Sequence, residues 1–259
     1  MTFMQNKMKE KVDNGKVAFG MQLRSCSKRI AEMIALSGFD FIYVEVEHFV
    51  CNDETMEDIF RAADIAGCTP IVRLCECSPA RITQVLEAGA RGVIAPHIET
   101  AEEAKAFVEA VKFPPIGKRS GAGSRFGWYG LVPAKEVRRI SNEQTLAIAM
   151  IESRKAVENL DAILDSGVDM IRVGFSDLSQ DMGHIGEPRH PEVIEMAKKI
   201  VDTAKAHCVT AGAKADNLAE AEFFAGLGFT HFSLGSDLAI LGKQFPNMVK
   251  EYNEKVNDK

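Results

Sequence analysis

Several features that mark other protein classes are missing from this sequence of 259 residues. No apolar run approaches the roughly 18 residues that would predict a membrane span, and the opening segment, MTFMQNKMKEKVDNG, lacks the uninterrupted apolar stretch of a secretory signal. No basic block is present, and 31 Lys and Arg against 37 Asp and Glu leave a net charge of −6. We therefore expect no membrane anchor and no nucleic-acid surface, which leaves small polar ligands and protein partners.

Two local motifs are also missing. The six cysteines show no CxxC spacing and are too sparse for a disulfide scaffold, so we expect free thiols in a reducing cytoplasm. Cys75 and Cys77 form a CxC, which on a strand would point to opposite faces and is therefore expected to be structural. No GxGxxG follows the first apolar run; the turn there reads RSCSKR, which offers no glycine cradle for a dinucleotide.

What the sequence does contain is a regular alternation. Short runs rich in Val, Ile and Phe are followed by polar turns and then by amphipathic stretches with apolar residues at spacings of three and four. Several of these stretches have a start signal, such as Asp53 or Ser78, and end at glycine. The eight predicted strands span residues 17–23, 39–47, 69–74, 92–96, 146–152, 169–174, 209–213 and 230–235. The glycines at predicted helix ends are Gly38, Gly67, Gly89, Gly167 and Gly228.

This alternation predicts the fold class. Strands that are apolar on both faces and alternate with helices require a parallel sheet covered by helices, and eight units of about 30 residues match a closed (β/α)8 TIM barrel. We expect one α/β domain over residues 1–259, and we disfavour an open doubly wound sheet because the glycine cradle is missing. One segment, 113–130, breaks the rhythm with five glycines and the only tryptophan; connections this long are usually functional or mobile, and the alternative is a solvated insertion.

Ionisable residues gather where the predicted strands end, beginning with FIYVEVEH at residues 41–48. In a barrel of this kind the loops after the strands converge on one cavity, where chemistry occurs. Charged groups facing such a cavity are costly unless they pair or hold a metal or a ligand. The set comprises Glu45, Glu47, His48, Arg73, His97, Glu152, Asp177, Lys214 and Asp237.

The residue types in this set indicate an enzyme. Glu152 and Asp177, from adjacent strand ends, suit a hard divalent cation such as Mg²⁺, Mn²⁺ or Co²⁺. Arg73 could clamp a carboxylate or enolate oxygen, and Gly174 begins a turn into a short helix whose free N–H groups could receive a carboxylate. His48 is then the acid/base candidate.

A cation, a carboxylate clamp and an imidazole together fit the cleavage of a 2-oxo acid with an enolate leaving group, which is aldol chemistry. A second route stays open, because a desolvated Lys214 could form a Schiff base with a keto acid. The basic residues Lys118, Arg119 and Arg125 could read an acidic or hydroxylated substrate tail or could be solvated.

At this point the sequence resembles a known family, the metal-dependent pyruvate aldolases typified by 4-hydroxy-2-oxoheptanedioate aldolase and 2-dehydro-3-deoxyglucarate aldolase. The resemblance covers nearly the whole chain, from GFDFIYVEVEH through PIVRL, LEAGARGVIAPHIETAEEA, FPPIGKRS and MIESRKAVENLDAIL to GFSDLSQDMGHIGEPRHPEV. It implies a modified barrel of the phosphoenolpyruvate/pyruvate superfamily, a last helix that packs on a neighbouring subunit, and a hexamer built as a trimer of dimers. It also implies release of pyruvate and an aldehyde from a 4-hydroxy-2-oxo acid.

Matched motif by motif, the resemblance implies a catalytic histidine at His48, a substrate-binding arginine at Arg73, and metal ligands at Glu152 and Asp177. Backbone groups of Gly174, Phe175, Ser176 and Asp177 would hold the pyruvate carboxylate, and a carboxylate from an adjacent subunit, Glu87, would work with the histidine.

Two departures from the family pattern lengthen an acidic side chain. The family's Asp-Gly-Glu-His is replaced by Glu45-Val46-Glu47-His48, and its Asp by Glu87. Displacements of about 1 Å matter in active sites, so these changes bear on the His48 relay and on the substrate. Related lyases acting on acyl-CoA or phosphoenolpyruvate, or a catalytically weakened keto-acid-binding protein, remain alternatives.

Overall fold

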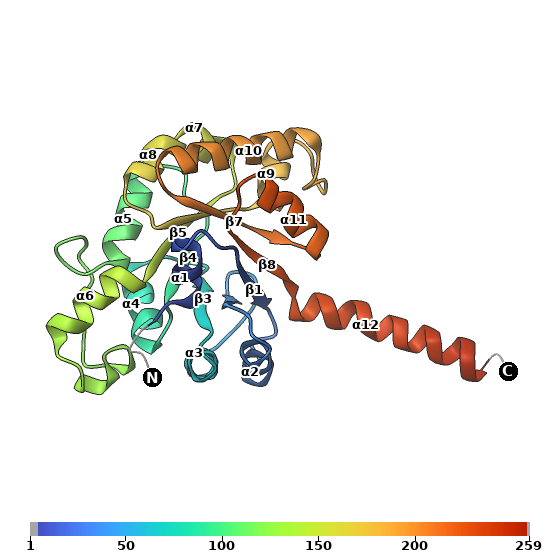
Figure 1. Ribbon diagram of the computed structural model, residues 1–259, viewed down its shortest axis with the longest axis horizontal. Helices are drawn as coiled ribbons and strands as arrows, with labels where there is room; N and C mark the ends of the chain where they lie inside the picture. The colour runs from blue at the N-terminus through green and yellow to red at the C-terminus, as the bar shows by residue number, and fades with distance from the viewer. Residues whose placement is uncertain (1–4, 258–259) are drawn as a thin grey trace.

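The computed structural model describes residues 5–257 and forms a closed barrel of parallel strands in the order β1 to β8, with β8 pairing back onto β1 (Figure 1). The predicted (β/α)8 barrel is confirmed. The strands are β1 Ala18–Leu23, β2 Phe41–Glu45, β3 Thr69–Arg73, β4 Gly92–Ala95, β5 Leu146–Ile151, β6 Met170–Val173, β7 Thr210–Ala215 and β8 His231–Ser236. Residues 1–4 and 258–259 lie outside the described part of the chain.

Helices surround the barrel. They are α1 Lys7–Asp13, α2 Lys28–Leu36, α3 Asp53–Ile65, α4 Pro79–Ala88, α5 Ala101–Val111, α6 Ala134–Gln144, α7 Arg154–Glu158, α8 Leu160–Asp165, α9 Phe175–Asp181, α10 Pro191–Ala206, α11 Leu218–Gly226 and α12 Asp237–Tyr252, with short helical turns at η1 Arg125–Gly130 and η2 Asn253–Asn257. The helices α1 and α6 were not predicted, and the stretch predicted as one helix after β5 is divided at Asn159 into α7 and α8.

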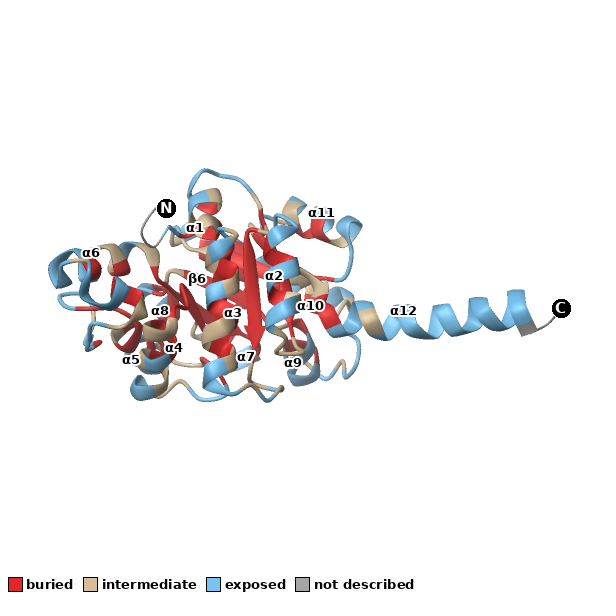
Figure 2. Cartoon of the chain, turned by 90° about the horizontal axis from the view of Figure 1, so that it is seen from below, coloured by how far each residue is buried: buried red, intermediate tan, exposed pale blue. Residues whose placement is uncertain are grey.

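Alternation along each strand divides the core into two layers. Side chains such as Phe41, Tyr43 and Ile148 fill the barrel interior, and α1 closes its N-terminal end with Met8 and Val12. The intervening strand residues face outward and pack against the helices in a larger cluster. Figure 2 shows the strands as the buried centre of the molecule.

Helix boundaries largely follow the predicted signals. Ser78 caps α4 by accepting a hydrogen bond from the backbone N–H of Arg81, and all five predicted terminal glycines adopt positive φ. The predicted cap at Asp53 is wrong by one residue: Asn52 caps α3, and Asp53 is the first helical residue.

Two local differences affect the site. Strand β2 ends at Glu45, so Glu47 and His48 lie in the following turn. Strand β7 continues to Ala215, so Lys214 lies on the strand rather than beyond it. The segment 113–130 is partly packed, since Phe113 and Phe126 form a small apolar cluster with Val137.

Helix α12 leaves the barrel and projects away from it (Figure 1). Figure 2 shows almost all of it exposed, and its exposed side chains are largely apolar: Leu238, Ile240, Phe245, Met248, Val249 and Tyr252. Among the described residues, no helix has the length and apolarity to span a bilayer.

Candidate active site

The end of β2 places a carboxylate inside the barrel. Glu45 is fully buried, and its Oε2 accepts hydrogen bonds from Gln22 Nε2 at 2.9 Å and from Arg73 Nε at 2.8 Å. Its Oε1 accepts a hydrogen bond from the backbone N–H of Glu47 at 2.9 Å, which shapes the turn after the strand. An acidic residue can end this strand inside the barrel because side chains from the neighbouring strands β1 and β3 donate hydrogen bonds to its carboxylate.

Arg73 joins two of these acids. Its Nη2 lies 2.5 Å from Glu45 Oε2, and its Nη1 lies 2.8 Å from Glu47 Oε2. Nη1 also approaches Met150 Sδ at 3.5 Å. The fork of the guanidinium is therefore used by Glu45, and only one N–H group of Nη2 has no partner in this arrangement. A substrate would meet the edge of the guanidinium rather than its fork.

Glu47 connects Arg73 to two histidines. His48 Nε2 lies 3.8 Å from Glu47 Oε2, and the His48 side chain is 60% exposed at the mouth of the barrel. On the other carboxylate oxygen, His97 Nε2 lies 3.2 Å from Glu47 Oε1. Glu47 thus positions imidazoles from the loops after both β2 and β4.

His97 bridges this group to Glu152. The backbone of His97 adopts a φ of 55°, which is uncommon for a residue other than glycine. This conformation brings its backbone N–H within 2.7 Å, and its Nδ1 within 3.1 Å, of Glu152 Oε1. Non-glycine residues held in this region often mark functional sites.

Glu152 and Asp177 meet at one hollow. Both line a cavity of about 430 Å³ together with His97, Ser153 and Gln180. Burial raises the pKa of the Glu152 carboxyl, and the negative charge of Asp177 adds to the rise, while the contacts of His97 oppose it. The two predicted metal-binding carboxylates therefore lie close enough to repel each other.

The backbone at Gly174 lies very close to the side chain of Glu152. A Cβ added at Gly174 would lie 2.6 Å from Oε2 of Glu152. Glycine is needed there so that the start of α9, which carries Asp177, can pass beside the carboxylate. Gly174 supplies no side-chain cap to α9, and the first N–H groups of a helix have no partners within the helix.

The charges of this site fit a cation. Four carboxylates, Glu45, Glu47, Glu152 and Asp177, gather at this end of the barrel, and the first two share the guanidinium of Arg73. Glu152 is buried, and a buried negative charge is costly unless it is protonated or neutralised. Carboxylate oxygens are the ligands that hard divalent cations prefer, so Glu152 with Asp177 suits such an ion.

Other predicted residues lie elsewhere within the chain. Glu87 contacts Arg119 at 3.1 Å and the hydroxyl of Ser124, not His48, and burial raises the pKa of its carboxyl. Lys214 pairs with Asp216 at 2.5 Å and is 41% exposed.

The remaining candidates also have structural partners. Asp237 accepts hydrogen bonds from the backbone N–H groups of Arg24 and Ser25. Lys118 pairs with Glu109 at 2.6 Å, and Arg119 is buried between the rings of Phe113 and Phe126.

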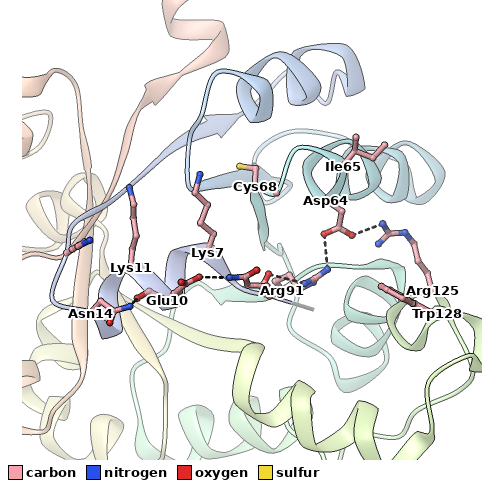
Figure 3. Close-up of a pocket in the computed structure, with 13 residues that line it drawn as sticks. Lys7, Glu10, Lys11, Asn14, Asp64, Ile65, Cys68, Arg91, Arg125 and Trp128 are labelled. Carbon is pink, nitrogen blue, oxygen red and sulfur yellow. Dashed lines mark hydrogen bonds and ion pairs between the residues drawn. The ribbon is translucent and has the colours of Figure 1, made fainter. Parts of the chain in front are cut away.

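A larger hollow, of about 750 Å³, lies at the opposite, N-terminal end of the barrel. Figure 3 shows Asp64 of α3 between Arg91 and Arg125, with Trp128 close to Arg125 and with Lys7 and Lys11 on the other side of the hollow. In TIM barrels this end supports stability and the other end carries the chemistry, so size alone does not identify the reacting site.

Sequence reasoning missed the structural role of two residues of this site, Gln22 and His97. Gln22 holds the inner acid, and nothing in its sequence context indicates this because it lies within an apolar strand. His97 was recognised only as one charged residue among several; its central place depends on its backbone conformation. The sequence PHIE after β4 does not by itself indicate that the backbone of residue 97 adopts a positive φ.

Comparisons with known proteins bear on the same region of the chain. A family model described as HpcH/HpaI aldolase/citrate lyase matches residues 18–242. The chain is 33% identical over 255 residues to a hydroxypyruvate/pyruvate aldolase of Chromohalobacter salexigens, covering 97% of this chain and 99% of that protein. It is 33% identical over 244 residues to a 4-hydroxy-2-oxo-heptane-1,7-dioate aldolase of Klebsiella pneumoniae, covering 93% and 91%.

Solved structures are also similar to this chain over nearly its whole length. An HpcH/HpaI aldolase from Desulfitobacterium hafniense superposes with a TM-score of 0.91 at 30% identity, covering 95% of this chain and 96% of that one. The citrate synthase SbnG superposes with a TM-score of 0.88 at 30% identity, covering 98% and 100%.

Proposed function

Because the chain belongs to the HpcH/HpaI aldolase/citrate lyase family, we propose that it cleaves a 4-hydroxy-2-oxo acid to pyruvate and an aldehyde with the help of a divalent cation. The protein is a carbon–carbon lyase. The observation that supports the cation is the meeting of Glu152 and Asp177 at one hollow, where burial and mutual repulsion raise the pKa of Glu152.

In this proposal Glu152 and Asp177 hold the cation. When bound, such an ion draws electron density from the carboxylate and keto oxygens of a 2-oxo acid and so favours enolate formation. The first N–H groups of α9, at Phe175, Ser176 and Asp177, receive the substrate carboxylate. Arg73 contributes positive charge and the free N–H of Nη2 beside the developing enolate oxygen.

We assign the proton transfer to His48. In the cleavage direction its imidazole removes the proton of the 4-hydroxyl group, the bond between C3 and C4 breaks, and the electron pair stays on C3 as the enolate of pyruvate. A proton then returns to C3. Glu47, 3.8 Å from His48 Nε2, is the nearest carboxylate to support a positive charge on this imidazole in the proposal. Because His48 is exposed at the mouth, we assign it to the aldehyde half of the substrate.

The environment of Lys214 argues against the Schiff-base route. A Schiff-base lysine must be uncharged when it attacks, which proteins achieve by desolvation or by a neighbouring cation. Lys214 is instead 41% exposed, and its ionic partner is the carboxylate of Asp216 at 2.5 Å, so it is neither desolvated nor paired with a cation.

Helix α12 supports an oligomer as part of the function. Its apolar side chains are exposed along its length, and a monomer would leave an unusually large apolar surface in water. We propose that α12 packs on a second copy of the chain. The separation of Glu87 from His48 within one chain is consistent with a site shared between copies, in which Glu87 serves the histidine of a neighbour.

The central experiment follows pyruvate release from a panel of 4-hydroxy-2-oxo acids, coupled to lactate dehydrogenase. Treatment with EDTA should abolish activity, and Mg²⁺, Mn²⁺ or Co²⁺ should restore it. Glu152→Gln should lower kcat by roughly a hundredfold or more, whereas Glu143→Gln, which changes an exposed carboxylate on α6, should leave kcat unchanged.

Three results would point elsewhere. Full activity in EDTA with borohydride trapping at Lys214 would establish the Schiff-base route. Absence of metal-dependent exchange of the C3 protons of pyruvate in deuterium oxide, followed by NMR, would indicate a binding protein. Turnover of acyl-CoA or phosphoenolpyruvate substrates alone would indicate a different lyase.

The shared site has its own test. Phe245→Asp with Val249→Asp should reduce the mass measured by light scattering if α12 forms an interface. Inactive Glu87→Ala and His48→Ala variants, mixed and reassembled, should recover part of the activity. A monomeric wild-type protein that is fully active would rule out the shared site.

A further inference from the structure

A second cluster of ligand-type side chains lies outside the site described above, in the connection between α9 and α10. His184, His190 and Glu192 each offer one donor atom, and the three atoms lie within 4.8 Å of one another. It is the only such group of three or more His, Cys, Asp or Glu residues within residues 5–257. The proposed aldolase reaction uses none of the three.

The local fold brings these residues together although six positions separate the histidines. Gly183, with a φ of 89°, ends α9, and the N–H of His184 donates to Ser179 O at 2.7 Å. Successive turns follow, with Glu187 N–H donating to His184 O and His190 N–H donating to Glu187 O, each at 3.0 Å. The two imidazoles consequently stack with ring centroids 3.6 Å apart.

The beginning of α10 supplies the third donor. His190 is the N-cap residue, and Pro191 fixes the first helical position. Glu192 follows in the first turn, and its Oε2 lies 3.1 Å from His184 Nε2. The carboxylate is therefore on the same side as the histidine pair. The backbone turns hold the two histidines next to each other, and the stacked rings must rotate about their side-chain bonds before both can direct a nitrogen at one ion.

We propose that His184, His190 and Glu192 form a binding site for a borderline transition-metal ion, of the class Zn²⁺, Ni²⁺ or Cu²⁺. Two imidazole nitrogens and one carboxylate oxygen are a recognised zinc ligand set that leaves a fourth position for water. Imidazole ligands favour these ions over Mg²⁺ and Ca²⁺, which select oxygen ligands. The chain thus carries two chemically different sites: an all-carboxylate pair at Glu152 and Asp177, and a nitrogen-rich site beyond α9.

The consequence of occupation is mechanical. An ion held by His184 and Glu192 would join the end of α9 to the start of α10. Helix α9 carries Asp177 at its other end, so the ion would restrain the helix that forms one wall of the candidate active site. Occupation should therefore raise thermal stability without supplying a reacting group.

Another His and carboxylate group offers a matched control. His207 Nε2 lies 2.8 Å from Asp161, and its Nδ1 lies 3.0 Å from Asp165. Its two ring nitrogens contact different carboxylates, and among the described residues His207 belongs to no group of three donor side chains. His207→Gln therefore changes a surface histidine with acidic partners but removes no chelating group.

The test uses full-length protein stripped with EDTA, in a Glu152→Gln background that weakens the carboxylate pair. Zinc binding measured by calorimetry should show one ion per chain, and Mg²⁺ should show no binding in this background. Adding His184→Gln or Glu192→Gln should weaken zinc binding by roughly tenfold or more, since even the outer partners of metal ligands contribute on the scale of 10–100-fold. Adding His207→Gln should leave zinc affinity unchanged.

Cobalt absorption provides a second measurement. Co²⁺ bound to this ligand set should give visible bands that His190→Gln abolishes, and these bands report ligation independently of enzyme activity. Absence of zinc binding in the Glu152→Gln background, or equal weakening by His207→Gln, would overturn the proposal. Because Glu192 is exposed, its replacement tests the site even if changes at His184 disturb folding. Failure of zinc binding here would leave the aldolase proposal untouched, and failure of the aldolase assays would leave this site untouched.

Discussion

The acidic side chains at the two ends of the barrel differ in how many cationic partners they have. At the N-terminal end two acids are each paired with two cations: Asp64 lies 2.9 Å from Arg91 and 2.6 Å from Arg125, and Asp40 is paired with Lys7 and Lys11 of α1. Figure 3 shows the first of these groups. The negative charges there are fully compensated by the protein.

At the C-terminal end two acids share one cation. Glu45 and Glu47 share one guanidinium, and Glu152 and Asp177 face each other across a hollow. The difference indicates that the N-terminal end is built to hold the barrel together, and that the C-terminal end keeps negative charge for something that binds. Changes at the C-terminal end should therefore lower activity, whereas changes at the N-terminal end should lower stability alone.

The largest effect is expected for Arg73→Ala. It would leave Glu45 fully buried without its guanidinium, and breaking a buried ion pair on one side costs about 3–5 kcal/mol. Loss of the positive charge beside the enolate should also lower kcat/KM by roughly a hundredfold to a thousandfold. Urea unfolding and the pyruvate-release assay measure the two effects. Arg73→Lys should recover part of the stability because it restores the charge but not the fork.

Near-normal turnover by Arg73→Ala would contradict its proposed contact with substrate. An unchanged free energy of unfolding would contradict the pairing with Glu45 that the structure shows.

The matched change at the other end is Asp64→Asn. It would remove the shared partner of Arg91 and Arg125 and should lower the free energy of unfolding by about 1–3 kcal/mol, less than at Arg73 because these side chains are partly exposed. Activity under folding conditions should stay within roughly twofold of the wild type, because TIM-barrel chemistry is confined to the other end. A large loss of kcat with little loss of stability would show that the N-terminal hollow takes part in the reaction.

The smallest and most diagnostic effect concerns pH. Burial raises the pKa of Glu152 above its usual value of 4.5, so in metal-free protein the native state holds this proton more tightly than the unfolded chain. The stabilising contribution is fully present below pH 4.5 and is lost as the pH rises through the raised pKa. In EDTA at neutral pH, Glu152→Gln should therefore be more stable than the wild type while being inactive.

Glu99→Gln provides the opposite sign. Hydrogen bonds from Lys155 and Ser153 lower the pKa of Glu99, so its contribution is present above pH 4.5 and is lost as the pH falls through the lowered pKa. Unfolding measured across pH should show opposite changes for the two variants. Destabilisation of metal-free protein by Glu152→Gln would contradict the strained carboxylate pair.

Much of the fold could be predicted because it depends on local patterns. Apolar strands, helical spacing and terminal glycines such as Gly67 and Gly228 are each readable within a few residues of sequence, and the eight strands were found with small errors at their ends. The errors fall where tertiary contacts decide: β7 continues through Lys214, and α1 forms because Met8 and Val12 close the barrel.

The residues of the candidate site could be proposed from the sequence, but the contacts between them could not. The sequence identified Arg73, Glu152 and Asp177 because charged residues at the ends of apolar strands are expensive. It could not show that the fork of Arg73 is taken by Glu45, or that His97 bridges Glu47 and Glu152, because these contacts join four segments far apart in the chain.

By itself, the sequence determined the barrel and the types of charged residue that gather where its strands end, because periodicity and the cost of burying charge act along the chain. Only the tertiary structure decided which charges compensate one another. The net negative charge around Glu152, the isolation of Glu87 from His48 and the convergence of His184, His190 and Glu192 all depend on how separate loops turn back toward each other, and distances between loops are set by packing rather than by local propensity.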